Sequence, residues 1–308
     1  EGAVLMEAEH IHRAVAERAM RSSMIADKMH EDMVDGLVLL ESEGQRVGVV
    51  NGLAVLSVGE HEFGRPFRVT ARVFSGSEGV VNIEHEVDMS GELHDKGVQI
   101  LMGLLGDRFA QTAPLAMTAT VTFEQSYGAV DGDSASSTWL FAILSALSGI
   151  ALDQGIGVTG SINQLGEIQP VGGVNHKVEG FFRFCKSRGL TGRQGIMLPA
   201  QNIQHLMLEA DVRAAIDAGE FHVWPIRTIE EGISILTGVE AGERDEHGNV
   251  PPDTVMGRVV ARLETLRQST DGSAVRRARR GGSQLRRAVR RTREHDDGAD
   301  RDDDDGYD

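Results

Sequence analysis

Two short segments hold side chains whose types and spacing are suited to nucleophilic chemistry. The first, YGAVDGDSASSTWLFAIL (residues 127–144), places Ser134 directly before an apolar run with helical spacing. The second, GEIQPVGGVNHKVEGFF (residues 166–182), places Lys177 near the start of a further expected helix. A serine hydroxyl attacks a carbonyl efficiently when a base accepts its proton, and a neutral lysine amine can be that base. Ser134 and Lys177 are therefore the candidate nucleophile and base.

The expected surroundings of both residues favour this chemistry. A helix that begins near Ala135 leaves the backbone amides around Ser134 unpaired at the positive end of the helix dipole, where they could stabilise an oxyanion. Burial and a helix N-terminus both disfavour an ammonium group, so they would lower the pKa of Lys177. The chain has only four lysines against 27 arginines, and a retained lysine is a weak sign that a titratable amine is required.

Each of these residues also has an ordinary structural explanation. Ser134 alone is more often a helix cap, and Lys177 alone is more often a solvated helix residue. Asp131 and Asp133 flank a glycine in a turn before a helix, which is where capping residues are common. A functional and a purely structural role for the two aspartates therefore both stay open at this point.

Several catalytic, nucleotide-binding and metal-binding motifs are absent from the sequence. GDSAS differs from the Gly-x-Ser-x-Gly elbow of α/β-hydrolases because Ser136 replaces the second glycine. DGDSASSTWLFA lacks the glycine and the closing glutamate of a calcium-binding loop. No Gly-x-x-x-x-Gly-Lys-Ser/Thr phosphate loop occurs, and the 11 histidines show no zinc spacing. We expect no metal and no bound cofactor in this stretch of chain.

The elements that must position Ser134 and Lys177 follow from the hydrophobic periodicity. Helices are expected at residues 7–32, 95–111, 135–148, 176–187, 202–219, 228–238 and 255–268. Strands are expected within residues 34–60, 65–74, 79–87, 115–123, 155–162, 166–173, 194–199 and 221–226, with Asn51-Gly52 as a hairpin turn. The first half is rich in antiparallel strands and the second half alternates strands with helices. We therefore predict an α/β (α+β) fold.

Composition limits the class of protein and its partners. A chain of 308 residues with 40% hydrophobic residues and 37 glycines suits a mixed α/β globule with a sizeable core. Almost all of the net charge of −16 lies before residue 243, because the residues from there on carry 14 arginines and 15 acids. An acidic body argues against wrapping nucleic acid, so only the arginine-rich tail remains as a candidate nucleic-acid contact.

Two further features bear on the compartment. No apolar run reaches the roughly 18 residues needed to cross a bilayer, so no membrane partner is expected. The single cysteine, Cys185, cannot form an intrachain disulfide, which fits a reducing compartment. We therefore expect a cytoplasmic protein.

The two segments that hold Ser134 and Lys177 together resemble a known protein family. FEQSYGAVDGDSASS, followed by VTGSINQLGEIQPVGGVNHKVEGFF, resembles the proteolytic domain of the Lon protease family. The separation of 43 residues between Ser134 and Lys177 (177 − 134) matches the spacing of the Ser–Lys dyad in that family. The DGDSAS form is similar to the LonB and Lon-like branch, and the resemblance extends from about Asp35 to Gly238.

The resemblance implies a division of the chain into three parts. Residues 33–240 would be a Lon-type proteolytic domain, with an antiparallel-rich N-terminal half and an α/β C-terminal half. Residues 1–32 would be the helical end of an AAA+ ATPase module. Residues 241–308 would be a linker and a disordered charged tail, which is not part of the family pattern.

The resemblance also implies roles for individual residues. Ser134 is the nucleophile and Lys177 is the general base of the dyad. Asp131 and Asp133 occupy positions where the branch carries acids that pair with the lysine or shape the site. Thr159 matches a threonine that packs near the dyad, and its ordinary explanation is a buried hydroxyl satisfied by the backbone.

The implied function is that of a serine endopeptidase that degrades unfolded or damaged proteins for protein quality control. Such an enzyme acts as a homo-hexamer and is normally coupled to hydrolysis of ATP, with Mg, by an upstream AAA+ module. One alternative is an ATP-independent Lon-like peptidase, and another is a non-catalytic Lon-fold domain for ring assembly or DNA handling. The presence of both Ser134 and Lys177 counts against the non-catalytic alternative.

One residue departs from the family pattern. His176 stands directly before the candidate base, where the family commonly has glutamate. A neutral or cationic neighbour in that position could lower the pKa of Lys177 further.

Overall fold

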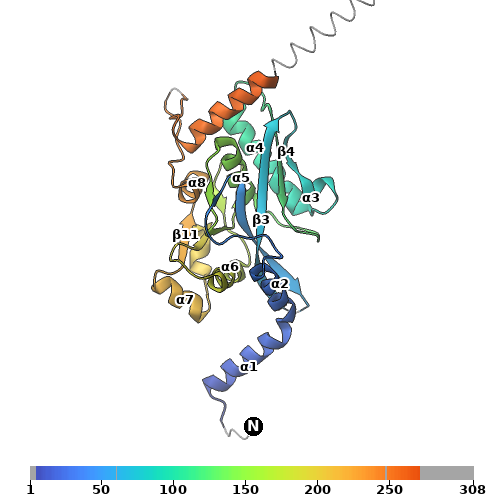
Figure 1. Cartoon of the computed structure of the whole chain (residues 1–308), viewed down its shortest axis with the longest axis vertical. Helices are drawn as coiled ribbons and strands as arrows, with labels where there is room; N and C mark the ends of the chain where they lie inside the picture. The colour runs from blue at the N-terminus through green and yellow to red at the C-terminus, as the bar shows by residue number, and fades with distance from the viewer. Residues whose placement is uncertain (1–4, 60, 247, 271–308) are drawn as a thin grey trace, which may run out of the picture.

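The computed structural model describes residues 5–59, 61–246 and 248–270 (Figure 1). Its labelled α-helices are α1 Ala8–Ser22, α2 Met24–Val34, α3 Ile83–Glu86, α4 Glu92–Phe109, α5 Ser136–Ser148, α6 Val174–Arg188, α7 Ala210–Asp217 and α8 Ile229–Thr237. Its strands are β1 Gln45–Arg46, β2 Val49–Val58, β3 His61–Ser75, β4 Gly79–Asn82, β5 Met117–Phe123, β6 Leu152–Asp153, β7 Ile156–Val158, β8 Ser161–Ile162, β9 Ile168–Gln169, β10 Gly195–Pro199 and β11 His222–Ile226. A 3-10 helix spans Ala200–His205, and an unlabelled helix spans residues 255–270.

A seven-stranded mixed sheet is the framework on which the helices are placed. Its strand order is β11-β10-β7-β2-β3-β5-β4. The β2–β3 and β3–β5 pairs from the first half of the chain are antiparallel. Strands β7, β10 and β11 from the second half pair in parallel with one another, and β7 also pairs in parallel with β2. The predicted α/β fold, antiparallel-rich in its first half, is confirmed.

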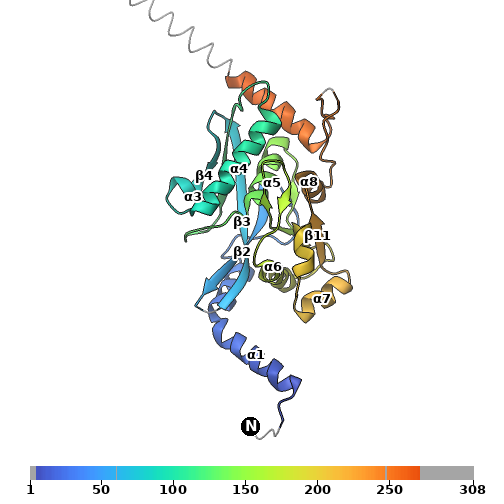
Figure 2. The ribbon, with the colours of Figure 1, turned by 180° about the vertical axis from the view of Figure 1, so that it is seen from behind.

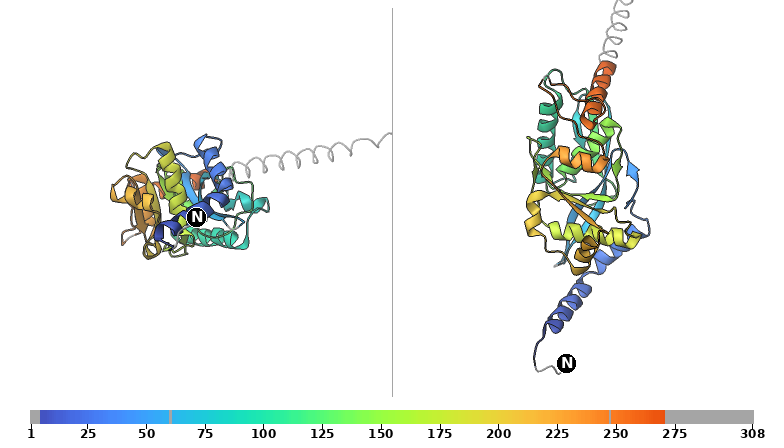
Figure 3. Two further views of the ribbon diagram at one scale, coloured as in Figure 1. Left: turned by 90° about the horizontal axis from the view of Figure 1, so that it is seen from below. Right: turned by 90° about the vertical axis from the view of Figure 1, so that its left-hand side faces the viewer.

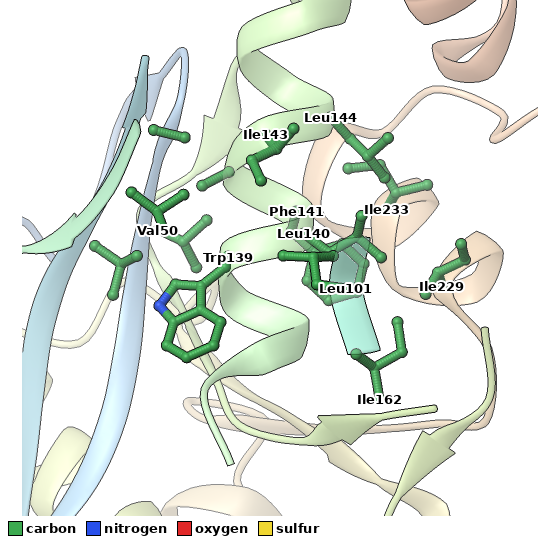
Figure 4. Packing of buried hydrophobic residues seen from close by; sticks show 14 of the residues in the cluster. Val50, Leu101, Trp139, Leu140, Phe141, Ile143, Leu144, Ile162, Ile229 and Ile233 are labelled. Atoms are coloured by element: carbon green, nitrogen blue, oxygen red, sulfur yellow. The ribbon is translucent and has the colours of Figure 1, made fainter. Parts of the chain in front are cut away.

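Helix α5 lies at the centre of the larger hydrophobic core. Every residue of α5 except Ala146 is buried, as expected of a helix that is apolar on nearly all sides. Figure 4 shows Val50 and Trp139 on the strand side of the helix and Ile229 and Ile233 of α8 on its other side. Because packed elements enclose α5, the turn at its N-terminus is held in a defined place.

A second hydrophobic cluster forms around α6, the helix that carries Lys177. The rings of Phe181, Phe182 and Phe184 are buried, and Phe221 before β11 packs on the first two of them. Met33 of α2 belongs to the same cluster. Helix α6 is therefore held in place by packing along its length, below the turn that carries Lys177.

The packed body continues beyond the predicted end of the domain. Residues from 241 onward were expected to form a linker and tail, but Val255, Met256 and Val259 are buried in the main cluster. The amphipathic helix that they begin has an apolar face, and the core covers it. This helix and α1 lie at opposite ends of the molecule (Figures 1, 2 and 3).

The predicted disorder and nucleic-acid contact of the tail fall on residues 271–308, outside the described residues.

The predicted hairpin turn at Asn51-Gly52 was wrong, because both residues lie inside β2. The Asn51 side chain is buried and donates to the backbone carbonyls of Glu41 and Gln154, at 2.8 and 2.7 Å. A Cβ on Gly52 would lie 3.3 Å from Cγ2 of Thr138, so the glycine lets α5 approach the strand. Tertiary contacts, rather than a turn, therefore explain the Asn51-Gly52 pair.

Two other expected elements are shorter than predicted. The strand expected over residues 79–87 ends at Asn82, whose side chain accepts from the Glu84 amide and caps α3. The helix expected over residues 202–219 is interrupted near Met207, whose amide donates to the Asn175 side chain at 2.8 Å. In both places a side-chain contact competes with the regular element.

No helix in the described part of the chain combines the length and the apolar character needed to cross a bilayer.

Candidate active site

Ser134 lies in the turn before α5 but does not cap it. Helix α5 begins at Ser136, and its N-cap position is Ala135, without a side-chain cap. Within the described residues, the backbone amides of Ser134 and Ala135 donate no hydrogen bond. The ordinary explanation of Ser134 as a helix cap therefore fails, and two amides remain available beside its hydroxyl.

Hydrogen bonds tie the turn that carries Ser134 to the segment after β7. This pairing of two segments over 20 residues apart in the chain holds the serine against the Thr159 region. Four of the contacts are Gly160 N to Ser134 O at 3.0 Å, Ser161 Oγ to Asp133 Oδ2 at 2.7 Å, Ile162 N to Ser136 Oγ at 3.0 Å, and Ser137 Oγ to Gly160 O at 2.7 Å.

A close crossing of β3 and α6 sets the position of Lys177. A Cβ on Gly64 of β3 would lie 1.7 Å from the His176 carbonyl oxygen, and a Cβ on Gly180 of α6 would lie 2.2 Å from the Gly64 carbonyl oxygen. Neither position has room for a side chain, so the two backbones meet directly. Lys177, in the first turn of α6, is only 3% exposed.

The structure brings together Ser134, Lys177 and Thr159. The Lys177 Nζ lies 3.0 Å from the Ser134 Oγ and 3.0 Å from the Thr159 Oγ1. Thr159 is fully buried, and its hydroxyl also donates to the Ser134 carbonyl at 3.5 Å. Burial lowers the pKa of Lys177 from 10.5 to about 8. With that pKa, roughly a tenth of the molecules carry a neutral amine at pH 7.

Asp133 acts on Lys177 through its charge, while its carboxylate is engaged by another residue. The Ser161 hydroxyl donates to Asp133 Oδ2 at 2.7 Å. The field of Asp133 raises the pKa of Lys177, against the larger effect of burial. Among the described residues, no hydrogen bond or ion pair joins the two side chains. Asp133 thus influences the amine without pairing with it.

Asp131 holds the start of α4 and, among the described residues, makes no hydrogen bond or ion pair with Lys177. Its Oδ1 accepts from the amides of Leu93 and His94, at 3.2 and 3.3 Å, and from the Gly132 amide at 2.8 Å. The N-cap residue of α4 is Gly91, which has no side chain to cap the helix. Asp131 therefore supplies the missing cap from a different segment.

Replacing Asp131 with alanine is expected to destabilise the protein by about 1 kcal/mol, because the first-turn amides of α4 lose their acceptor. Asparagine keeps an acceptor oxygen, so its effect should be smaller. Urea unfolding of both variants measures this. Equal stability of the alanine variant and the unmodified protein would contradict a capping role.

The predicted effect of His176 on the base was wrong. The His176 ring faces Glu62 and Glu179, with a nitrogen 3.9 Å from a carboxylate oxygen of each. The pKa of Lys177 is lowered by burial, and Asp133 is the charge that acts on it. Because adjacent helix residues point in different directions, neighbours in sequence need not share an environment.

An apolar groove of about 500 Å³ opens beside Ser134. One of its sides is formed by residues 53–56 of β2, with Phe67 of β3, and another by the loop of residues 125–132. Ser134 and Ala135, whose amides are unpaired, also line it. Ser134 and Ala135 bring a hydroxyl and two free amides to this groove, and the Lys177 amine lies 3.0 Å from that hydroxyl, an arrangement suited to acyl transfer. No group of three His, Cys, Asp or Glu side chains in the described part of the chain could hold a metal ion.

His94 is a groove residue that the sequence did not indicate. It is fully buried on α4, with its ring centroid 4.5 Å from that of Trp139. Neither ring nitrogen has a hydrogen-bond partner among the described residues. Burial lowers the pKa of His94, and the fields of Glu84, Asp95 and Asp131 oppose that change. The only signal in the sequence was a histidine directly before the helix expected at residues 95–111.

The lowered pKa of His94 makes stability depend on pH. Its ordinary value is 6.5, so the unfolded chain binds a proton at His94 more readily than the folded chain does. The free energy of unfolding should therefore fall as the pH drops below about 6.5, by up to about 1.4 kcal/mol per unit. Urea unfolding between pH 7.5 and 5 should show this loss, and His94→Leu should reduce it. An identical pH slope in the variant would refute the assignment.

Comparison with known proteins identifies the fold and its relatives. Residues 39–236 match the family model of the Lon protease (S16) C-terminal proteolytic domain. The chain is 36% identical over 230 residues to a putative Lon protease homolog of Escherichia coli (strain K12), an alignment covering 74% of this chain and 39% of that protein. It is 30% identical over 236 residues to an archaeal Lon protease of Archaeoglobus fulgidus, covering 75% of this chain and 34% of that protein.

A third relative, a putative Lon protease homolog of Haemophilus influenzae, is 35% identical over 242 residues, which is 78% of this chain and 40% of that protein. The chain thus spans about two-fifths or less of the length of these relatives. The family model covers most of the described body, including the sheet, α5 and α6. This chain belongs to the Lon protease (S16) family and contains its C-terminal proteolytic domain.

Proposed function

We propose that this chain is the proteolytic part of a serine endopeptidase that uses Ser134 as nucleophile and Lys177 as general base. The observation that carries the proposal is the 3.0 Å contact between the Ser134 hydroxyl and an amine whose pKa is lowered to about 8. A neutral amine at that distance can accept the serine proton as Oγ attacks a peptide carbonyl.

The remaining contacts of the site fit the later steps of such a reaction. The Lys177 ammonium formed in the attack donates its proton to the leaving amine, and the neutral amine then activates water to hydrolyse the acyl-enzyme. The free amides of Ser134 and Ala135 are the candidate donors to the oxyanion. Thr159 accepts one N–H of Lys177, and the neutral amine can then turn its lone pair toward Ser134 to accept the proton.

The substrates that we propose are unfolded or damaged proteins. The groove beside Ser134 is mostly apolar, which suits a chain segment with exposed hydrophobic side chains. We propose further that the longer protein works as a homo-hexamer, with ATP hydrolysis by an upstream AAA+ module delivering the chain to the site. The greater length of the relatives leaves room for such a module.

Degradation of casein, an unfolded protein, tests the proposed activity. The unmodified chain is expected to produce new N-termini that mass spectrometry identifies, whereas Ser134→Ala is expected to produce none. Ser57→Ala, at an exposed serine of β2, serves as the matched control and should cleave as the unmodified chain does. Cleavage by the Ser134→Ala variant at the unmodified rate would reject the proposed function.

ATP coupling is tested separately on the full-length protein. Casein degradation with and without ATP and Mg separates the ATP-dependent enzyme from an ATP-independent Lon-like peptidase. We expect faster degradation with ATP. Equal rates would favour the ATP-independent alternative.

A further inference from the structure

We propose that Arg65 determines specificity by binding an acidic side chain of the substrate, Asp or Glu, which presupposes the peptidase function proposed above. Arg65 lies on β3 opposite Ala54 of β2 and lines the same groove as Ser134. The residue before it, Gly64, touches the turn of α6 that carries Lys177. An arginine is therefore built into the wall of the groove close to the dyad.

The Arg65 guanidinium has no hydrogen-bond acceptor and no ion-pair partner in the described part of the chain. Its Nε is buried without a hydrogen-bond acceptor, and no ion pair forms with a described carboxylate. The guanidinium carbon lies 4.5 Å from the ring centroid of Phe67, two residues along the strand and on the same face. This cation–π contact with Phe67 restrains the guanidinium and leaves its N–H groups without acceptors.

The other charged groups of the groove are already engaged. Asp32 of α2 forms an ion pair with Lys28 at 3.2 Å, and its field raises the pKa of Arg65 against the lowering by burial. Asp131 accepts from the amides of α4, and the buried His94 has a lowered pKa. Arg65 is thus the permanent cation among the side chains that line the groove.

A carboxylate is the ligand that best fits this environment. A partly buried charge without a partner is costly, and a planar carboxylate can accept two parallel N–H bonds from the guanidinium. The surrounding groove surface at Leu53, Val55 and Leu56 is apolar. The preferred substrate segment would therefore combine apolar residues with one acid. An endopeptidase cuts within a chain, so the acid that we propose is a side chain and not a chain terminus.

Paired peptides test this inference. Each pair would share one apolar sequence with an amidated C-terminus and differ by Glu or Gln at a single position within four residues of the cleaved bond. At one such position, the unmodified chain should favour Glu over Gln in kcat/KM by about 10- to 100-fold. The ratio should fall to about 1 in Arg65→Gln. The Arg65→Glu variant should instead favour a third peptide that carries Lys at the same position. Arg72→Gln, at an exposed arginine of the same strand, should keep the unmodified ratio.

Binding gives a readout that does not depend on turnover. In the Ser134→Ala background, fluorescence anisotropy should show tighter binding of the Glu peptide than of the Gln peptide, and adding Arg65→Gln should remove the difference.

A Glu-to-Gln ratio near 1 at every position, or an unchanged ratio in a folded Arg65→Gln variant, overturns the role of Arg65. Tighter binding only when the C-terminus is a free carboxylate would overturn it in favour of a terminus site. Failure to cleave either peptide would instead count against the proposed peptidase, and the binding ratio would still decide this inference.

Discussion

Replacing Lys177 with methionine is expected to lower peptide-bond hydrolysis by about 10⁴-fold or more, because Ser134 then lacks the base 3.0 Å away. Methionine has a similar length and no titratable group. Since Lys177 is only 3% exposed, the variant also avoids burying an amine, and its free energy of unfolding should not decrease. Casein cleavage and urea unfolding of the same preparation separate lost chemistry from lost folding.

Two comparisons sharpen this prediction. Lys186→Met, on the same helix at an exposed lysine that pairs with Asp211, should retain the unmodified rate. The double variant Ser134→Ala/Lys177→Met should be no slower than either single variant, because a nucleophile and its base act as a unit. If Lys177→Met kept more than about a hundredth of the activity, another group would have to be the base.

The rate of hydrolysis is expected to rise about tenfold per pH unit up to about pH 8 and then to level off. Only the neutral amine can accept the serine proton, and the pKa of Lys177 is about 8. Between pH 6 and pH 8 the neutral fraction, and with it kcat/KM, should increase by about 50-fold. A profile of kcat/KM between pH 5.5 and 9.5, measured with an uncharged peptide, tests this.

Asp133→Asn should move that profile to lower pH. The carboxylate of Asp133 raises the pKa of Lys177, so its removal leaves burial unopposed and favours the neutral amine. Asp131→Asn is the matched control, because Asp131 binds the amides of α4. A shift to higher pH in Asp133→Asn, or no shift, would show that the charge of Asp133 does not act on the base.

The parts of the site that the sequence predicted are those carried by contiguous motifs. Ser134 stands before an apolar helix and Lys177 begins another, and both helices occur close to the predicted residues. Gly238 ends α8 in the left-handed conformation, as a glycine at that position should. Here local pattern and tertiary packing favour the same element, so the residue types alone were sufficient.

The parts that the sequence missed depend on contacts between distant segments. Asn51-Gly52 has the composition of a turn, but Asn51 satisfies distant carbonyls and Gly52 makes room for α5. Asp131 caps a helix about 40 residues earlier in the chain, which no local capping pattern indicates. Arg65 and His94 reach the groove from β3 and α4, and only the folded arrangement brings them beside Ser134.

The central claim is that a neutral Lys177 amine activates Ser134, and the rate of labelling by a fluorophosphonate reagent tests it most directly. This reagent phosphonylates an activated serine: the serine oxygen attacks phosphorus and fluoride leaves, with no need for substrate delivery or ATP. We predict that mass spectrometry finds the label on Ser134, that the rate rises with pH to a plateau with an apparent pKa of about 8, and that Lys177→Met is not labelled. Labelling of Ser134 at the same rate in Lys177→Met, or at a rate independent of pH, would contradict the account.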